Sequence, residues 1–132
     1  MTFASEIKDT KKRLESLGHV VFIPPDTELH VKDPGLVDNL DSNHKHALEN
    51  DIMRKSFNLV AQVDAILVLN HLKNDVSGYI GTSSLMEIGL AYYLKKKIFL
   101  LNKIPNPQDA RWAHEISIMK AVIIDGDLSK VE

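Results

Sequence analysis

One carboxylate, Glu87, stands inside an apolar stretch of the sequence, where such a group can carry chemistry. The helix predicted over 84–94 has apolar residues around most of its circumference, so we expect it to be buried. The residues three and four positions from Glu87 are serine, leucine and alanine, and none of them is a cation. A buried carboxylate must be hydrogen-bonded or protonated, because burial without either is costly. Glu87 is therefore the first candidate for a functional group.

The sequence around Glu87 supports two different roles. A carboxylate held close to a substrate can act as a nucleophile on an electrophilic sugar carbon, or as a general acid or base. The run Ser84-Leu85-Met86-Glu87 also matches a capping box, with Ser84 as the N-cap and Glu87 reaching back to its N–H. Gly81 and Ser84, where the glycine-containing loop meets the helix, are candidates for binding a substrate. From the residues alone, both roles of Glu87 remain open.

The elements that must position Glu87 alternate between helix and strand. This alternation predicts one α/β domain over 1–132, with a layered parallel sheet of four strands and right-handed crossovers. Between the first strand and the second helix, Asp26–Ser42 lacks a sustained period and is predicted as a long mobile loop with room for one helical turn. The predicted helices are 2–17 (N-cap Thr2, stop at Gly18), 43–62, 84–94 and 108–120, and the predicted strands are 20–23, 65–69, 98–101 and 122–125.

The order of these elements differs from the usual one at its start. Doubly wound domains normally begin with a central strand, whereas this chain begins with a helix. We therefore expect the usual N-terminal central strand to be missing. An open position in the sheet would favour pairing with another chain.

Polar residues follow the predicted strands at one edge of the sheet, where ligands bind in open parallel sheets. Asn70 and Asn102 each follow a strand and can hydrogen-bond a sugar or a base, although asparagine there is also a common turn former. Asp75 can orient a substrate hydroxyl or act as an acid, or it can be an exposed loop residue. The segments expected along this edge are 24–26, 70–81, 102–106 and Asp125.

The composition excludes several classes of function. The formal net charge of −2 leaves no basic excess for binding nucleic acid. The absence of cysteine excludes thiolate chemistry, and His44 and His46, two positions apart, do not form a metal-ligand pattern on a helix. No apolar run approaches the roughly 18 residues of a membrane span. We expect a cytoplasmic protein without a metal or cofactor and without a membrane or nucleic-acid partner.

Four segments resemble the nucleoside 2-deoxyribosyltransferase-like superfamily, which includes the 2′-deoxynucleoside 5′-monophosphate N-glycosidases. They are Asp-Ala-Ile-Leu-Val-Leu-Asn (64–70), Gly-Tyr-Ile-Gly (78–81), Met-Glu-Ile-Gly-Leu-Ala (86–91) and Lys-Ile-Phe-Leu-Leu-Asn (97–102). The resemblance implies a flavodoxin-like, three-layer parallel sheet. It also implies a homodimer or larger homo-oligomer whose sites are completed by a neighbouring subunit.

The resemblance further implies a reaction. Glu87 matches the family's helix glutamate, which attacks C1′ of a deoxyribonucleoside or nucleotide and displaces the base to form a glycosyl-enzyme. Members commonly carry an aspartate where Asn70 stands, which leaves Asp75 as the acid nearest to that role. A non-catalytic nucleotide-binding or sensing module of the same fold is the alternative. A response-regulator receiver would need an aspartate at position 70 and is set aside.

Overall fold

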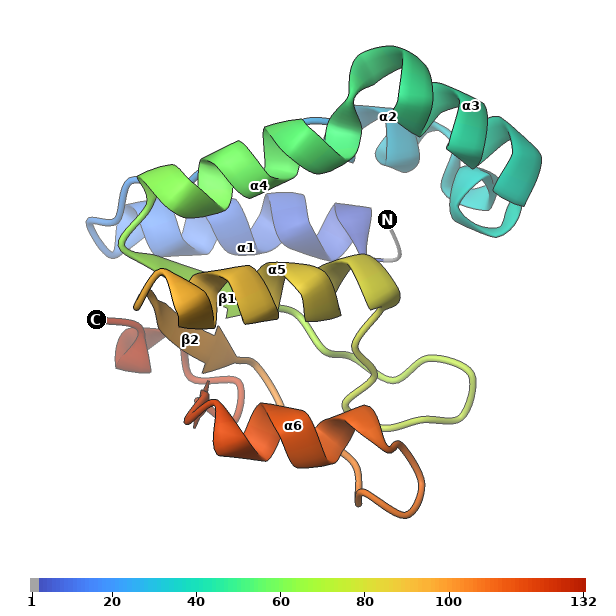
Figure 1. Ribbon diagram of the computed structural model, residues 1–132. Coiled ribbons are helices and arrows are strands. Elements are labelled where there is room, and N and C mark those ends of the chain that lie inside the picture. Colours follow the sequence, from blue (N-terminus) through green and yellow to red (C-terminus); the bar gives the residue numbers. More distant parts are fainter. Residues whose placement is uncertain (1–2) are drawn as a thin grey trace. The chain divides into compact units, whose positions relative to one another are not determined.

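The computed structural model describes residues 3–132, with the side chain of Val37 excepted, and divides the chain into two units, 1–59 and 60–132. The first unit is built from helices, and the second combines helices with a sheet (Figure 1). Among the described residues, no helix is both long enough and apolar enough to cross a membrane. The α/β class predicted from the sequence is confirmed.

Three parallel strands form the sheet of the second unit. They are β1 (Ala65–Val68), β2 (Lys97–Leu100) and β3 (Val122–Ile123), in the order β1-β2-β3. The continuous apolar runs in β1 and β2 are typical of parallel strands, whose two faces are both covered. Three of the four predicted strands are thus found, and each begins within one residue of its predicted start.

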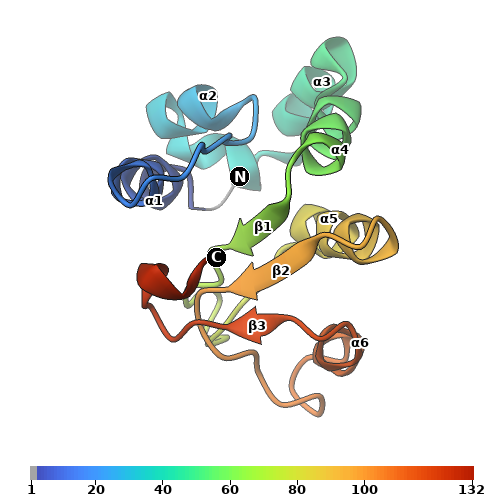
Figure 2. The ribbon, with the colours of Figure 1, turned by 90° about the vertical axis from the view of Figure 1, so that its left-hand side faces the viewer.

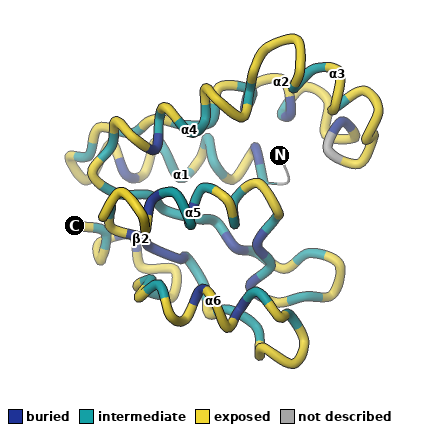
Figure 3. The backbone as a smooth tube through the Cα atoms, viewed as in Figure 1, coloured by how far each residue is buried: buried dark blue, intermediate teal, exposed yellow. Residues whose placement is uncertain are grey.

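Two helices of the second unit lie on the same side of its sheet. They are α5 (Thr82–Tyr93) and α6 (Trp112–Ile118), each of which connects one strand to the next (Figure 2). Successive right-handed crossovers that advance in one direction place both helices on one face. The middle strand, β2, is buried over most of its length (Figure 3). The buried core of this unit comprises Val60, Ile80, Ile88, Ala91, Ile98, Leu100 and Ile116.

The first unit consists of short helices. The first helix, α1, spans Ala4–Ser16 and is followed by Gly18 at φ +95°, which agrees with the predicted stop; the predicted N-cap at Thr2 lies outside the described residues. An ion pair between Lys8 Nζ and Glu28 Oε1 (2.9 Å) joins α1 to α2. The other helices are α2 (Thr27–Lys32), the 3₁₀-helix η1 (Pro34–Asp38), α3 (Leu40–Asn50) and α4 (Ile52–Gln62), which continues into the second unit.

The long loop predicted over Asp26–Ser42 is wrong, because most of this segment is helical. A different local feature stands at the start of each helix, and only at α3 is it a side-chain cap. The hydroxyl of Thr27 donates to Pro24 O (2.7 Å), Pro34 occupies the start of η1, and Asn39 Oδ1 accepts a hydrogen bond from Ser42 N (3.2 Å). Helices of five or six residues are too short to establish a periodic apolar pattern, which is why the sequence showed none.

The single helix predicted over 43–62 is also wrong, because it is divided into α3 and α4 at Asp51. Asp51 has φ +50°, a left-handed conformation that aspartate tolerates better than most residues. Leu48, on α3, is 68% exposed.

The strand predicted over Val20–Ile23 is not formed. Its β-branched residues favour extended backbone, but within the described residues no strand pairs with this segment. Val20 and Phe22 are exposed (86% and 60%), whereas Val21 and Ile23 are half-buried. Apolar content alone therefore did not distinguish a paired strand from an unpaired segment.

Two histidines share one carboxylate in the first unit. His30 is buried, and its Nε2 lies 3.1 Å from Asp26 Oδ2. Nε2 of His46, on α3, lies 3.9 Å from the same oxygen and, although buried, has no hydrogen-bond partner. Burial of the ring lowers the pKa of His30, and the opposing effect of the Asp26 carboxylate does not outweigh it. His30 is therefore neutral where a free histidine begins to be protonated.

We expect the folded state to lose stability as the pH falls below 6.5, the ordinary pKa of histidine. Because the folded-state pKa of His30 is lowered, the unfolded chain binds the proton more readily, and acid favours unfolding. Denaturant unfolding at pH 7 and pH 5.5 measures this loss, which His30→Gln should reduce. His44→Gln, at an exposed position on α3, is the control and should retain the full loss. An equal loss in the His30→Gln variant would contradict the assignment.

Candidate functional site

Asn70 and Asn102 hold together the carboxyl ends of β1 and β2. Asn70 Nδ2 donates to Asn102 O (2.7 Å), and Asn102 N donates to Asn70 Oδ1 (2.8 Å). Asn102 Nδ2 in turn donates to Asn70 O (3.2 Å). Asn70 is fully buried, with 0% of its surface exposed. The amides thus continue the pairing of the two strands after their last ladder residues.

This arrangement changes how the two predicted substrate contacts are interpreted. The amide oxygen and nitrogen of Asn70 are both directed at the backbone of Asn102, and no part of Asn70 is exposed to a ligand. Asn102 is half-buried and uses its amide nitrogen on Asn70. In the structure the pair has a structural role, because each amide satisfies buried backbone groups of the other residue.

A tight turn accounts for the position of Asp75. Lys73 and Val76 exchange both of their backbone hydrogen bonds, N–H of Lys73 to O of Val76 (3.2 Å) and N–H of Val76 to O of Lys73 (2.8 Å). The two central residues, Asn74 and Asp75, have φ of +52° and +61°. Positive φ at both central positions defines a type I′ turn, which asparagine and aspartate favour. Asp75 is thus a turn former, and its exposed side chain also borders a cavity.

Gly78 allows the two loops at this edge of the sheet to touch. Its φ is +77°, and a Cβ atom placed on it would lie 2.0 Å from the carbonyl oxygen of Lys103. Only glycine fits there without displacing backbone. The loop after β1 and the loop after β2 are therefore in direct backbone contact.

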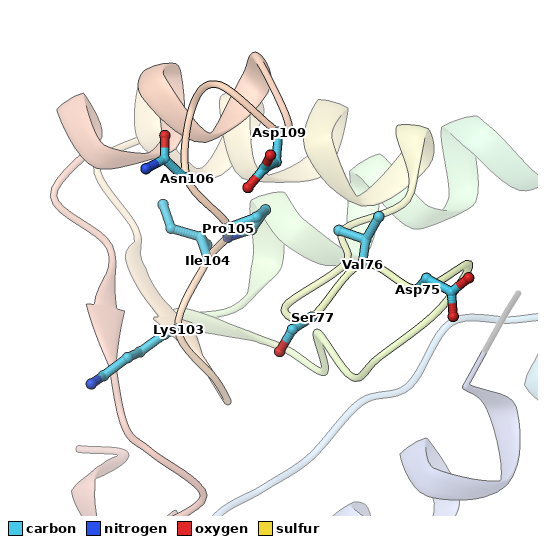
Figure 4. Close-up of a pocket in the computed structure, with 8 residues that line it drawn as sticks. All are labelled: Asp75, Val76, Ser77, Lys103, Ile104, Pro105, Asn106 and Asp109. Atoms are coloured by element: carbon cyan, nitrogen blue, oxygen red, sulfur yellow. The ribbon is translucent and has the colours of Figure 1, made fainter.

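Between these two loops lies an open cavity of about 540 Å³. Its position beyond the carboxyl ends of parallel strands is the usual ligand site of open α/β sheets. Figure 4 shows Val76, Ile104 and Pro105 in its middle, with the side chains of Lys103 and Asp75 at opposite ends. The lining residues are Asp75, Val76, Ser77, Lys103, Ile104, Pro105, Asn106 and Asp109.

The lining combines an apolar surface with groups that bind polar atoms. Val76, Ile104 and Pro105 offer a surface for a flat or apolar group, and Ser77, Asn106 and Asp109 offer hydrogen-bond donors and acceptors. The volume lies within the range of small-molecule sites, roughly 300–1,000 Å³. The cavity can therefore accept a molecule with one apolar ring and several polar substituents.

Glu87 lies on α5, five residues after the helix begins at Thr82, and its side chain is half-buried. The capping box is wrong, because Gly81 is the N-cap and its carbonyl accepts the first helical hydrogen bond from Leu85 N (3.0 Å). Ser84 is accordingly inside the first turn rather than at the cap. Glu87 is not one of the eight residues that line the cavity.

The structure brings together some of the predicted site residues. The segments 70–81 and 102–106 do meet at one edge, as predicted, and they supply seven of the eight lining residues. Of the individual residues predicted to contact substrate, only Asp75 lines the cavity; Gly81 and Ser84, like Asn70 and Asn102, do not. Asp109 also lines the cavity, although the sequence did not predict it. It lies beyond the expected segment 102–106 and belongs to no recognisable motif.

No metal site accompanies this cavity. Across residues 3–132 there is no group of three or more histidine, aspartate or glutamate side chains arranged to hold a metal ion. The charged side chains of the cavity are two carboxylates, Asp75 and Asp109, and one ammonium group, Lys103. An anionic substituent of a ligand would therefore be bound most favourably at the Lys103 end.

Asn70→Ala should lower the free energy of unfolding by about 2–3 kcal/mol, because it leaves buried backbone groups of Asn102 without partners. Asn102→Ala should cost less, about 1 kcal/mol, since it removes one longer bond, of 3.2 Å. Urea unfolding followed by circular dichroism measures both changes. Equal costs, or a larger cost for Asn102→Ala, would show that Asn70 does not hold the two strand ends together.

Gly78→Ala should destabilise the second unit by more than about 1 kcal/mol, because the new methyl group meets the Lys103 carbonyl and the φ is unfavourable. Gly89→Ala is a matched control within α5, where an added Cβ meets nothing within 4 Å. That variant should be neutral or more stable, by up to about 1 kcal/mol, since alanine favours helix. Thermal unfolding of both variants measures these changes in stability. A Gly78→Ala variant as stable as the wild type would contradict the close contact between the two loops.

Comparisons of the chain with protein-family models, with curated proteins and with solved structures found no match. What the protein does must therefore be argued from the cavity and from the residues around it. The relevant features are the two loops joined at Gly78, the apolar and polar lining of the cavity, and the carboxylate of Glu87 on the helix that follows the first loop.

Proposed function

We propose that this protein binds a nucleoside or nucleotide in the cavity between the two loops and cleaves or exchanges its N-glycosidic bond through Glu87. The main support for this proposal is the combination of apolar and polar side chains that line the cavity. The surface of Val76, Ile104 and Pro105 suits a planar base, while Ser77, Asn106 and Asp109 suit ribose hydroxyls and ring nitrogens. The resemblance to nucleoside 2-deoxyribosyltransferase-like proteins supports the same ligand class.

The sheet is compatible with this proposal. Three parallel strands with helical crossovers are part of a flavodoxin-like layout, in which small ligands bind at the edge where the cavity lies. The helix with Glu87 begins directly after the first cavity loop. A phosphate on the ligand would be directed to Lys103, the cation at one end of the lining.

In the proposed reaction the Glu87 carboxylate attacks C1′ of the sugar. The C1′–N bond breaks, and the base leaves with the bonding electron pair and takes up a proton. The resulting ester between Glu87 and C1′ is then attacked by water, which gives hydrolysis, or by a second base, which gives transfer. Water can supply that proton, and the carboxyl oxygens of Asp75 and Asp109 in the cavity can accept hydrogen bonds from the sugar hydroxyls or from N–H groups of the base.

The test is release of free base from a panel of 2′-deoxynucleosides and their 5′-monophosphates, separated by liquid chromatography. Glu87→Gln should lower turnover by roughly a hundredfold or more, because removal of a group that acts directly on the substrate has at least that effect. Glu115→Gln, at an exposed position on α6, is the matched control and should retain full turnover. Turnover that Glu87→Gln leaves unchanged would contradict the role of Glu87.

Two observations favour a second function, a nucleotide-binding or sensing module without turnover. Glu87 does not line the cavity, and both asparagines that follow the strands bind the protein's own backbone. Calorimetric titration with the same panel distinguishes the two functions. Binding without base release would support the module, and base release would support the enzyme.

A further inference from the structure

A hydrogen-bonded turn lies in the loop after β2, where that loop borders the cavity. The carbonyl of Asn106 accepts hydrogen bonds from Asp109 N (2.9 Å) and Ala110 N (3.0 Å). The side-chain oxygen of Asn106, Oδ1, accepts a further bond from Gln108 N (2.9 Å). Asparagine favours the first position of such turns because its side chain bonds the backbone two residues on, and proline favours the second position. The sequence Asn-Pro-Gln-Asp (106–109) therefore fixes both the backbone and the side chain of Asn106.

The turn determines which atoms of Asn106 a ligand can meet. Because the N–H of Gln108 needs an acceptor, the amide oxygen of Asn106 is held in the turn, and its Nδ2 group is left as a donor. Within residues 3–132, this Nδ2 group makes no hydrogen bond, and the Asp109 carboxylate makes no hydrogen bond or ion pair. Both side chains are exposed and line the cavity. Asn106 thus offers an amide donor, and Asp109 offers a carboxylate acceptor.

The donor and the carboxylate lie close to each other. In a turn closed by a hydrogen bond between its first and fourth residues, the Cα atoms of those two residues are less than about 7 Å apart. Figure 4 shows the side chains of Asn106 and Asp109 in the part of the lining where Pro105 lies, away from Lys103. The turn therefore presents a donor and a carboxylate together, beside an apolar surface.

This pair of groups matches the hydrogen-bonding edge of one common base, guanine. Along its Watson–Crick edge guanine carries two adjacent donors, N1–H and the 2-amino group, followed by the acceptor O6. A carboxylate can accept hydrogen bonds from both donors at once, and hydrogen bonds to an ionised group are stronger than those between neutral groups. An amide donor beside the carboxylate can reach O6. Proteins commonly read unpaired bases by hydrogen bonds along this edge.

The other bases fit these two groups less well. Adenine and cytosine have an unprotonated ring nitrogen beside their amino group, and a carboxylate oxygen of Asp109 would face that acceptor. Thymine and uracil have a single N–H between two carbonyl oxygens, so the second carboxylate oxygen would again face an acceptor. A site that hydrogen-bonds one ligand rejects analogues that leave its polar groups unpaired. The lining therefore favours guanine over the other four bases.

We propose that the cavity selects a guanine base, with the Asp109 carboxylate accepting hydrogen bonds from N1–H and the 2-amino group and with Asn106 Nδ2 donating to O6. The inference rests on the proposed function, in which the cavity holds a nucleoside or nucleotide, and it names the base that the cavity prefers. The face of the guanine ring lies against Ile104 and Pro105. Asn106 and Asp109 determine base specificity in this arrangement, and neither acts on the glycosidic bond.

Calorimetric titration with a series of 2′-deoxynucleoside 5′-monophosphates tests the selection of guanine. The wild-type protein should bind the guanine nucleotide roughly tenfold or more tightly than the adenine, cytosine and thymine nucleotides. The hypoxanthine nucleotide differs from the guanine nucleotide only in lacking the 2-amino group. It should bind about fivefold more weakly, because one hydrogen bond to the carboxylate is lost.

Three variants assign the selection to individual side chains. Asp109→Ala should bind the guanine and hypoxanthine nucleotides with dissociation constants within about twofold of each other, because the group that distinguishes them is gone. Asn106→Asp keeps an acceptor for Gln108 N, and hence the turn, but loses the donor to O6, so it should bind the guanine nucleotide roughly tenfold more weakly. Gln108→Ala, in the same turn but outside the lining, is the matched control and should retain wild-type selectivity.

The outcomes separate this inference from the proposed function. Equal binding of the guanine and hypoxanthine nucleotides by the wild-type protein, or a preference for guanine that Asp109→Ala leaves intact, would overturn the inference. Release of all bases without preference would overturn the inference and leave the proposed function standing. Selective binding of the guanine nucleotide without base release would support the inference and contradict bond cleavage. Failure of every nucleotide to bind would overturn both.

Discussion

The exchange of hydrogen bonds between Asn70 and Asn102 is the interaction on which the rest of the second unit depends. A fully buried amide must satisfy its donor and acceptor within the protein, and Asn70 does so on the backbone of Asn102. The two strand ends are thereby held in register two residues past the ladder. Both cavity loops start at this point, so the amide pair determines where each loop begins.

Short-range sequence patterns predicted much of the second unit. Continuous apolar runs over 65–69 and 98–101 identified β1 and β2, because such runs are typical of strands in a parallel sheet. Val20–Ile23 has the same kind of run and does not form a strand. A strand requires a neighbour, and no property of those four residues reports whether a neighbour is present. In the first unit, the left-handed residue at Asp51 divided what periodicity predicted as one helix.

The site was predicted at the level of segments but less well at the level of residues. The rule that ligands bind beyond the carboxyl ends of parallel strands selected both cavity loops. It did not show that Asn70 and Asn102 bind each other, because that depends on a contact across 32 positions in the sequence. For Asp75, a turn made by Lys73 and Val76 explains the residue type. Of the two roles predicted for Glu87, the capping box with Ser84 as the N-cap is wrong, because the helix begins three residues earlier than that box required.

The close contact at Gly78 has a consequence for how this fold can vary among related sequences. Since Gly78 and the Lys103 carbonyl leave no space between them, neither loop can change its path unless the other moves as well. Insertions or deletions in the loop after β1 are therefore expected to occur together with compensating changes in the loop after β2. We therefore expect the two loops to vary together, and the shape of the cavity to change only when both of them change.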